Sequence, residues 1–439
     1  KYTHYLGDFT MAQQNTTATL DGLFKVVYGS GPINAIPEIA ILQKEIKFQS
    51  TEKIGKSYNF PVILSAEAGV TYLAAGAGVQ TLNDSIAAQL KEASVDANQI
   101  IIRGQMDYEA AAKAVNSKEA FKNASELLVE NLMETGSRRL EDAFLYGQSA
   151  SGLGASTSSA NSSTTKTVIT FTAASWAPGI YAGSENARVQ FWKVSDNTAA
   201  ATTNDFVISA VNFSLKTITV TGTATTGIGE LDTSISGGSV YMTWYGAKSG
   251  TSTWVEPVGI DKIITNAGSL FGIDASVYSL WSGSSFSFGS TAATVAKILN
   301  GVSLAVSKGG LMEEAAVLLS PKTYMNLAGT MTDLRRQNGG QKETTGIGGF
   351  ESITLMGPNG KLNLVVHPKV KEGEAFCVPF KRFKRIGSQE FSFETPGRKG
   401  ELFLHVPDKN AYELRLYGAQ AIICTNPAKC VKFTLIVNT

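Results

Sequence analysis

Cysteine is scarce in this chain of 439 residues, and long apolar runs are missing. The three cysteines, Cys377, Cys424 and Cys430, are too few for a disulfide framework and lack the paired spacing of a zinc site. No run reaches about 18 consecutive apolar residues, and Lys1 to Phe9 lacks the apolar stretch of a signal peptide. We therefore expect a chain that folds in cytoplasm, with neither export nor membrane insertion.

Histidine is equally rare, which limits the chemistry open to the chain. His4, His367 and His405 each stand alone, and no serine lies in a nucleophile elbow. Gly55, Lys56 and Ser57 match the end of a phosphate-binding loop, but the first glycine is missing and a strand pattern follows. The sequence predicts no catalytic residue, no cofactor and no metal site, so we expect a protein that is not an enzyme.

Charged residues are few as well. They make up 17% of the chain, against about 25% in a typical soluble domain. The 38 basic and 37 acidic residues give a net charge of +1, so no overall field holds the chain on nucleic acid or a membrane. A weakly charged surface favours association, and any contact with a polyanion must be local.

One local candidate is the run from Phe380 to Arg385, where phenylalanines alternate with pairs of basic residues. The basic side chains in it are Lys381, Arg382, Lys384 and Arg385. Three interpretations stay open: a solvated face, a contact with a partner subunit, or contact with nucleic-acid phosphates.

The first hundred residues predict extended structure. Residues 1–43 are interpreted as an N-terminal arm and residues 44–104 as an extended loop. The loop is predicted from strand patterns at Lys44 to Gln49, Ser57 to Ser65 and Ile100 to Arg103, around the Ala- and Gly-rich stretch Glu67 to Asn98. Structured loops of this length are usually functional.

A long helix is predicted next. Asn116 is its candidate N-cap, Glu119 is the capping-box partner, and Gly147 ends the pattern. At about 1.5 Å per residue such a helix is roughly 45 Å long. That length, with a charged side, indicates partial exposure and a bracing role.

Small polar residues make up almost all of Ser149 to Thr165, the composition of a flexible linker. Five strand patterns follow and predict an inserted all-β domain over 155–254: Thr167 to Thr172, Val189 to Val194, Phe206 to Val211, Lys216 to Thr221 and Ser239 to Tyr245. Four tryptophans raise the alternative of an adhesive or carbohydrate-binding protein: Trp176, Trp192, Trp244 and Trp254. Aromatic residues in such modules are more often core than ligand platform.

From Val255 onward the pattern becomes mixed α/β. Two helices are predicted, over Thr291 to Lys308 and from Pro321 with Ser320 as cap. The predicted strands are Ala315 to Leu319, a hairpin of Phe350 to Met356 and Lys361 to His367, then Glu374 to Pro379, Glu390 to Glu394, Leu402 to Val406, Ala411 to Thr425 and Lys432 to Val437.

Taken in order, this plan resembles the major capsid protein of tailed bacteriophages, with the Hong-Kong-97-type capsid fold. Tyr58 to Leu64 with Gly69 to Leu73 resembles the family's extended loop, and Asn116 to Gly147 its spine helix. Ala315 to Leu327 resembles part of the family's axial domain, and Glu401 to Gly418 resembles its strand-rich C-terminal part. Only Ala155 to Trp254 departs from the family plan, and the resemblance is one of architecture because the family has no short invariant signature.

The resemblance implies an α+β fold divided in a definite way. The expected parts are an N-terminal arm (1–43), an extended β-loop (44–104), a spine helix and peripheral domain (105–150 with 370–410), the inserted all-β domain (155–254) and an axial domain (255–369 with 411–439).

It also implies a structural subunit of the virion capsid, assembled in the host cytoplasm. Hexamers and pentamers would form an icosahedral shell around packaged double-stranded DNA, held by non-specific contact. Scaffolding, portal and decoration or cement proteins would be its partners, and no membrane is expected. Some family members cross-link a loop lysine to a distant asparagine; Lys91 is the only lysine in the loop proper, and no asparagine is singled out, so that chemistry is not carried over.

The loop itself supplies a physical argument for assembly. A loop of small residues cannot bury its own apolar positions, so we expect those positions to contact another copy: Val70, Tyr72, Leu73, Val79 and Leu82. Another phage structural subunit, such as a tail-tube protein, or an encapsulin-like shell remains the alternative.

Overall fold

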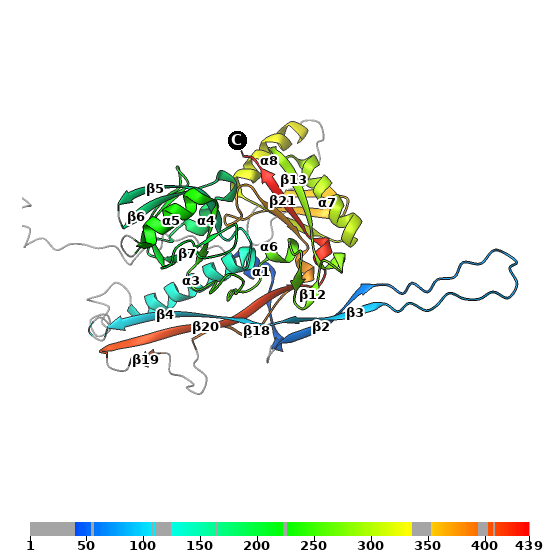
Figure 1. The fold of residues 1–439 in the computed structure, drawn as a ribbon, viewed down its shortest axis with the longest axis horizontal. Coiled ribbons are helices and arrows are strands. Elements are labelled where there is room, and N and C mark those ends of the chain that lie inside the picture. Colours follow the sequence, from blue (N-terminus) through cyan, green and yellow to red (C-terminus); the bar gives the residue numbers. More distant parts are fainter. Residues whose placement is uncertain are drawn as a thin grey trace, which may run out of the picture.

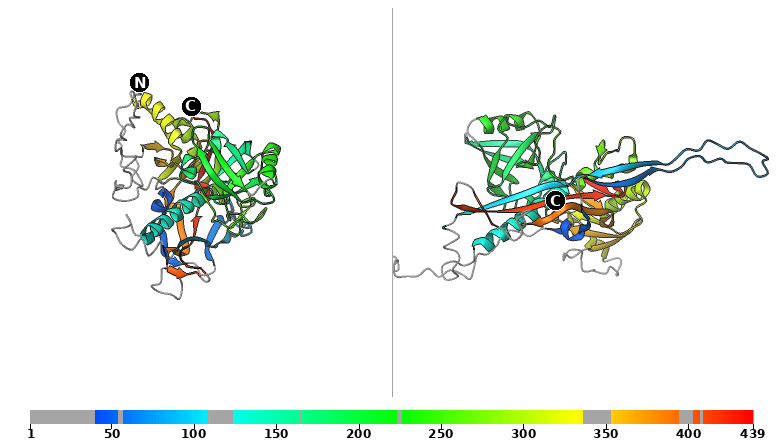
Figure 2. Two further views of the ribbon diagram at one scale, coloured as in Figure 1. Left: turned by 90° about the vertical axis from the view of Figure 1, so that its left-hand side faces the viewer. Right: turned by 90° about the horizontal axis from the view of Figure 1, so that it is seen from below.

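The computed structural model describes residues 40–53, 57–107, 109, 124–163, 165–222, 226–335, 353–393, 403–406 and 409–438. The molecule is elongated (Figure 1). A closed barrel and a mixed α/β body lie side by side over a long sheet, and a narrow hairpin projects from the end of the molecule opposite the barrel, as the right view of Figure 2 also shows. Within the described part, no helix is long and apolar enough to cross a membrane.

The long sheet is built around one fourteen-residue strand, β20 (Ala411–Cys424). The order is β1-β18-β20-β19, and β4 also pairs with β20. Its other strands are β1 (Phe48–Lys53), β4 (Asn98–Asp107), β18 (Phe383–Ser392) and β19 (Phe403–His405). β4 and β20 run antiparallel from Asn98 opposite Gln420 to Asp107 opposite Ala411, and together they form a long two-stranded ribbon.

Helix α3 (Ala124–Tyr146) lies along the ribbon of β4 and β20. Its 23 residues span about 35 Å at 1.5 Å per residue. Glycines allow the close approach: a Cβ at Gly104 of β4 would lie 2.8 Å from Leu128 Cδ1, and one at Gly136 of the helix 2.9 Å from Leu416 Cδ2. The predicted long helix is confirmed from Ala124 to Tyr146, and its predicted start at Asn116 lies outside the described residues.

The projecting hairpin consists of β2 (Tyr58–Ser65) and β3 (Gln89–Val95), which pair antiparallel. Between them residues 66–88 form no strand and make the far end of the hairpin. The sequence-predicted strand over Ser57 to Ser65 is confirmed. A phosphate-binding loop would require a helix after Ser57. The structure has the strand β2 there instead, as the sequence predicted.

The mixed body is a six-stranded sheet of order β13-β21-β17-β14-β16-β15. The strands are β13 (Ser284–Thr291), β14 (Ala315–Leu319), β15 (Ile353–Gly357), β16 (Gly360–Val366), β17 (Ala375–Val378) and β21 (Val431–Ile436). Helices α7 (Val295–Gly309) and α8 (Pro321–Arg335) complete the body. Ser320 Oγ accepts from the Thr323 N–H at 3.2 Å, which confirms the predicted cap of α8.

The barrel closes in the order β10-β5-β6-β9-β8-β7. Its strands are β5 (Gly154–Ser163), β6 (Lys166–Phe171), β7 (Arg188–Lys193), β8 (Phe206–Asn212), β9 (Thr217–Gly222) and β10 (Val240–Trp244). Helix α5 (Thr226–Gly237) and the short α4 (Pro178–Tyr181) belong to the same part. One continuous hydrophobic core runs from the barrel through α3 into the body, so the barrel is joined to the rest of the molecule by packing.

Short elements fill the junctions between these parts. They are α1 (Ile41–Glu45), α6 (Ile260–Ile264), β11 (Ser269–Leu270) and β12 (Ile273–Asp274), with single 3₁₀ turns at Ala173–Ser175, Ser279–Trp281, Phe380–Arg382 and Pro427–Lys429. Leu42 of α1 and Ile260 of α6 are fully buried, so both helices belong to the core.

Three sequence predictions need correction. The stretch predicted as a flexible linker, Ser149 to Thr165, contains the strand β5. Its small polar residues are held in the barrel: Ser156 is buried, and its hydroxyl donates to Thr170 O at 2.7 Å. The domain predicted as all-β contains α5. The strand predicted over Lys44 to Gln49 is the end of α1 followed by β1, with Leu42 and Ile46 buried.

The predicted division of the C-terminal half also needs correction. Residues 370–410 were expected beside the long helix, but β17 lies in the six-stranded sheet, paired with β14. Residues 411–439 were expected in the axial part, but β20 lies in the long sheet and only β21 joins the six-stranded one. The chain therefore crosses between the two sheets at Pro379 and again at Thr425. Most of the N-terminal arm predicted over 1–43 lies outside the described residues.

Candidate assembly surfaces

The far end of the hairpin carries exposed apolar side chains. The five predicted contact residues are all exposed: Val70 by 55%, Tyr72 by 92%, Leu73 by 54%, Val79 by 105% and Leu82 by 71%. Ile63, Ile86 and Leu90 are also exposed on the same hairpin, and the sequence reasoning missed them. The signal that could have found Ile86 and Leu90 is their place in the same stretch of small residues, Glu67 to Asn98, as the five predicted residues.

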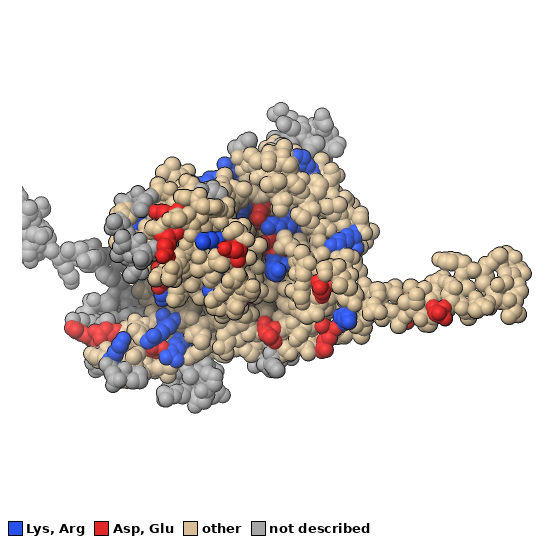
Figure 3. All heavy atoms as spheres, viewed as in Figure 1, with Lys and Arg blue, Asp and Glu red and all other residues tan. Residues whose placement is uncertain are grey.

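Hydrogen bonds hold the outgoing and returning segments of this hairpin end together, although neither segment forms a strand. Ala68 N–H donates to Ile86 O at 3.1 Å, and Asn83 Nδ2 donates to Val70 O at 2.8 Å. Only two charged residues, Glu67 and Asp84, occur between Ala66 and Leu90. In Figure 3 the projection is accordingly almost free of charged side chains.

The root of the hairpin is fixed to the body. Ala93 and Val95 are buried, and Ser94 N–H donates to Phe271 O at 2.9 Å. The ring of Phe60 lies 6.4 Å from that of Trp281. A firmly held root with an apolar far end is a shape that presents a surface to another molecule.

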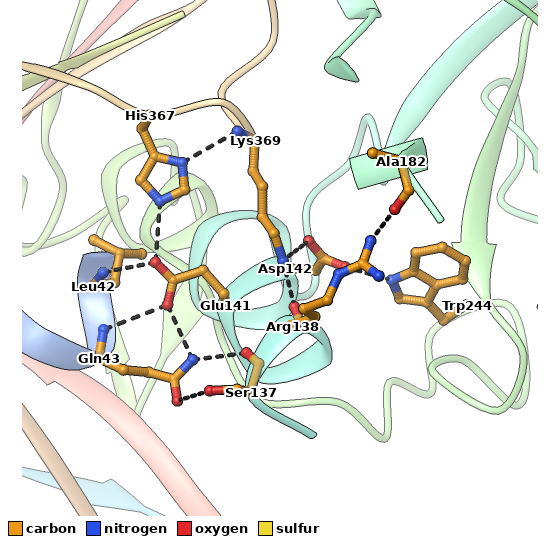
Figure 4. A network of polar contacts seen from close by, with 10 residues as sticks. All are labelled: Leu42, Gln43, Ser137, Arg138, Glu141, Asp142, Ala182, Trp244, His367 and Lys369. Atoms are coloured by element: carbon orange, nitrogen blue, oxygen red, sulfur yellow. Dashed lines mark hydrogen bonds and ion pairs between the residues drawn. The ribbon is translucent and has the colours of Figure 1, made fainter. Parts of the chain in front are cut away.

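A buried polar network holds α3 against the rest of the molecule (Figure 4). Glu141 Oε1 accepts from His367 Nε2 at 3.0 Å and from the Leu42 N–H at 2.6 Å. Burial raises the pKa of Glu141, but the hydrogen bond from His367, the Leu42 N–H and the Lys369 charge outweigh it, so that the pKa lies below its usual value. One carboxylate thus joins α1, α3 and the loop after β16.

The next residue of α3 continues the network toward the barrel. Asp142 pairs with Lys369 Nζ at 2.9 Å and accepts from the indole N–H of Trp244 at 3.1 Å. Arg138 donates to the Ala182 carbonyl, and Arg139 stacks on Trp244 with 3.2 Å to the ring centroid. Because Trp244 ends β10, this side of α3 fixes the barrel as well.

A second buried group ties the barrel to the six-stranded sheet. Lys371 Nζ donates to Ser151 Oγ at 2.9 Å and to Gly152 O at 2.8 Å. Lys216 of the barrel pairs with Glu372 at 2.7 Å. These contacts join the barrel to the loop before β17.

The basic run after β17 is partly used within the chain. Arg382 pairs with Glu313 at 2.7 Å, and Lys429 shares the same carboxylate at 2.8 Å. Arg385 is buried and pairs with Glu390 at 2.5 Å. Lys381 is exposed. A contact of Lys381, Arg382, Lys384 and Arg385 with a polyanion or a partner stays a prediction, and the structure brings Arg382 and Arg385 into internal ion pairs.

The remaining singled-out residues have structural surroundings. His367 is buried in the network, His405 lies exposed in β19 beside Tyr412, and His4 is outside the described residues. Trp176, Trp192 and Trp244 are buried in the core. Trp254 stacks on Tyr241, with ring centroids 6.5 Å apart. The described structure therefore offers no row of exposed tryptophans for the carbohydrate-binding alternative.

Comparison with known proteins adds a fold relationship. No family model matches the chain, and no curated protein sequence matches it. The capsid of cyanophage A-1(L) superposes with a TM-score of 0.52 over 96% of this chain and 99% of that chain, at 10% sequence identity. The chain has the Hong-Kong-97-type capsid fold. The predicted fold class and the predicted resemblance to phage capsid proteins are thereby confirmed.

Other solved structures are similar at lower scores. The capsid of the native GTA particle gives a TM-score of 0.49 at 8% identity, over 97% of this chain and 100% of that one. The holo-SrpI encapsulin complex from Synechococcus elongatus gives 0.45 at 9% identity, over 97% and 96%.

Proposed function

We propose that the chain is a major capsid protein, a structural subunit that self-assembles as hexamers and pentamers into an icosahedral shell. The shell would enclose packaged double-stranded DNA, held without sequence preference. The observation that carries this proposal is the hairpin of β2 and β3, which presents Tyr72, Val79 and Leu82 to solvent far from the subunit's own core. The capsid fold supports it.

Energetics favour a partner for that hairpin. Burying one large apolar side chain contributes about 1.5–3 kcal/mol, and eight such side chains are exposed along the hairpin: Ile63, Val70, Tyr72, Leu73, Val79, Leu82, Ile86 and Leu90. Repeated around a closed ring and then over a closed shell, contacts of this size sum to a stable particle. The hairpin then acts as the subunit's main assembly element.

The buried contacts between the parts of the subunit support the same role. The hydrogen bond between Glu141 and His367 and the contacts of Asp142 with Lys369 and Trp244 hold the helix α3 to the barrel and to the six-stranded sheet. A subunit whose parts do not shift against one another can repeat the same contacts around a ring. Scaffolding, portal and decoration or cement proteins would then act on the assembled shell.

Sedimentation of the purified chain, followed by negative-stain microscopy, tests the proposal. A capsid subunit gives fast-sedimenting closed particles, and their nuclease-resistant content identifies the cargo. Protected double-stranded DNA in native particles supports a phage shell, whereas protein cargo without DNA identifies an encapsulin-like compartment. Open tubes identify a tail-tube subunit, and a stable monomer overturns the proposal.

A further inference from the structure

Two of the three cysteines face each other where the chain passes from the long sheet to the six-stranded sheet. Cys424 is the last residue of β20, and Cys430 comes directly before β21. Their Sγ atoms lie 4.0 Å apart, and both side chains are fully buried. Six positions separate the two residues in the chain, so the two thiols meet across one short turn.

Hydrogen bonds hold the backbone at both ends of this turn. Thr425 N–H donates to Arg382 O at 3.0 Å, next to Cys424. Cys430 N–H donates to Pro427 O at 2.9 Å, and the Cys430 carbonyl accepts from Ser284 N–H at 3.0 Å. A disulfide bond is about 2.0 Å long, so the two sulfur atoms have about 2 Å to close, a distance that side-chain rotation supplies.

The third cysteine is placed differently. Cys377 lies in β17 opposite Val431 and shares a hydrophobic cluster with Val431 and Phe433. Cys424 and Cys430 belong to the other large cluster, with Phe376. Successive side chains of a strand point to opposite faces, so Cys377 and Phe376 pack on opposite sides of the six-stranded sheet. The facing pair is therefore Cys424 with Cys430, and Cys377 serves as an internal reference.

One carboxylate fastens the turn from outside the pair. Glu313 pairs with Lys429 of the turn at 2.8 Å and with Arg382 at 2.7 Å. Arg382 lies where the chain passes from β17 into β18, so Glu313 joins the two crossings between the sheets. An oxidant reaches the buried thiols only when this turn opens, and the ion pairs of Glu313 resist that opening.

The surroundings keep the thiols protonated and slow to react. Burial raises the pKa of Cys430 well above its ordinary value, and the neighbouring Cys424 and the Glu313 charge raise it further. The thiolate is the form that attacks a disulfide. In a reducing cytoplasm such a pair stays reduced, and we expect it to react only during long exposure to oxidising surroundings.

We propose that Cys424 and Cys430 form a redox pair, which closes to a disulfide when the folded subunit meets a low-molecular-weight disulfide such as oxidised glutathione. One protein thiolate attacks the small disulfide, forms a mixed disulfide and releases one small thiolate. The second protein thiolate then attacks the protein sulfur of the mixed disulfide and releases the other. The two protein protons end on the two small thiols, so the pair loses two electrons and the small disulfide gains two.

The bond would fix the crossing between the two sheets. It links the last residue of β20 to the residue before β21, and it closes the chain over residues 425–429. A disulfide stabilises a protein mainly by restricting its unfolded chain. The inference concerns the single subunit and does not depend on its assembly, so it goes beyond the proposed function.

Peptide mapping of the unaltered chain tests the bond. Trypsin cuts after Arg415, Lys429 and Lys432, so the two cysteines fall in separate peptides, 416–429 and 430–432. The folded chain is incubated with oxidised glutathione for hours to days, blocked with N-ethylmaleimide in denaturant and digested without reductant. The inference predicts that the two peptides become linked, with the loss of two hydrogen atoms. Peptides that stay separate, whether blocked or carrying glutathione, overturn it.

Variants assign the bond to this pair. Cys377→Ala should give the linked peptides as the parent does, and Cys424→Ala should give none. Linked peptides that contain Cys377 would overturn the assignment. Glu313→Gln removes the ion pairs that fasten the turn and the charge that raises the pKa of Cys430. It should therefore speed linkage by roughly two- to ten-fold. An unchanged rate would contradict the role of Glu313.

Thermal unfolding of dissociated subunits tests what the bond does. The oxidised parent should unfold about 2–6 °C higher than the reduced parent, because the bond restricts the unfolded chain. Cys424→Ala, treated in the same way, should show no difference between the two conditions. Equal unfolding temperatures for a parent in which peptide mapping shows the bond would overturn the stabilising role. Both measurements use single subunits, so their failure leaves the proposed assembly standing.

Discussion

His367 Nε2 lies 3.0 Å from Glu141 Oε1, and both side chains are fully buried. The same imidazole accepts from the Lys369 N–H through Nδ1 at 3.2 Å. The two residues are 226 positions apart in the chain, so this single contact joins the long helix to the loop after β16. A buried pair of this kind is costly to break from one side only.

Replacing Glu141 by alanine should therefore destabilise the subunit. The change leaves His367 and the Leu42 N–H without an acceptor, and we expect a loss of about 3–5 kcal/mol in the free energy of unfolding. Urea unfolding of the dissociated subunit measures it. Glu185→Ala, an exposed glutamate close to the same helix, is the control and should stay within about 0.5 kcal/mol of the parent. Equal effects from both changes would refute a special role for Glu141.

Glu256 predicts an unusual pH dependence. Its pKa is raised from 4.5 to about 8 in the folded chain, so between these values the folded state holds a proton that the unfolded state has lost. Stability contributed by this site therefore falls as pH rises from about 4.5 to about 8. Glu256→Gln keeps an acceptor for the Gln148 N–H and removes the titration.

The variant is compared with the parent at pH 5 and pH 8 by thermal unfolding. The gain of Glu256→Gln over the parent should be small at pH 5 and roughly 2–4 kcal/mol at pH 8. This range follows because a pKa that differs by one between the folded and unfolded states corresponds to about 1.36 kcal/mol, with an allowance for solvent screening. Parallel pH profiles for the two proteins would show that Glu256 ionises normally.

Much of the fold follows from local sequence. The run Ala315 to Leu319 is wholly apolar and precedes Ser320 and Pro321, so strand β14, the cap and helix α8 are all predicted where they occur. The hairpin of β15 and β16 turns at Gly357 and Gly360, as the turn residues indicate. In these places propensity, pattern and capping agree with the tertiary structure.

Other parts depend on distant partners and could not be predicted. Strand β5 consists of small residues without alternation, and it exists because β6 and β10 pair with it on both sides. Glu141 reads as an ordinary helix-surface charge until His367 and α1 are placed against it. The exposed loop side chains were predicted, because small residues around them leave apolar positions that the loop itself cannot bury.

Two helical glycines should respond in opposite directions to alanine. A Cβ on Gly301 of α7 would collide with the ring of Phe433, whereas one on Gly229 of α5 would meet nothing within 4 Å. We expect Gly301→Ala to cost about 1–3 kcal/mol through overpacking, and Gly229→Ala to add about 0.5–1 kcal/mol through helix propensity. Unfolding midpoints of both variants decide this. Stabilisation by Gly301→Ala would show that α7 does not pack on β21 as described.

The exposed hairpin should matter for assembly and hardly at all for folding. In the triple variant Tyr72→Ser, Val79→Ser and Leu82→Ser, the melting temperature of the unassembled subunit should stay within about 2 °C of the parent, since these side chains contact no core. Particle yield should fall at least ten-fold, because each replaced side chain no longer contributes about 1.5–3 kcal/mol from apolar burial at the interface. Phe213→Ser with Leu215→Ser on the barrel is the control. Normal particle yield from the triple variant would contradict the role of the hairpin.

Cryo-electron microscopy of particles formed by the purified chain tests the central claim most directly. The account predicts closed icosahedral shells of hexamers and pentamers, in which density for residues 66–88 of each subunit lies on a neighbouring subunit. Monomers, open tubes, or closed shells in which the hairpin end touches no other copy would contradict it.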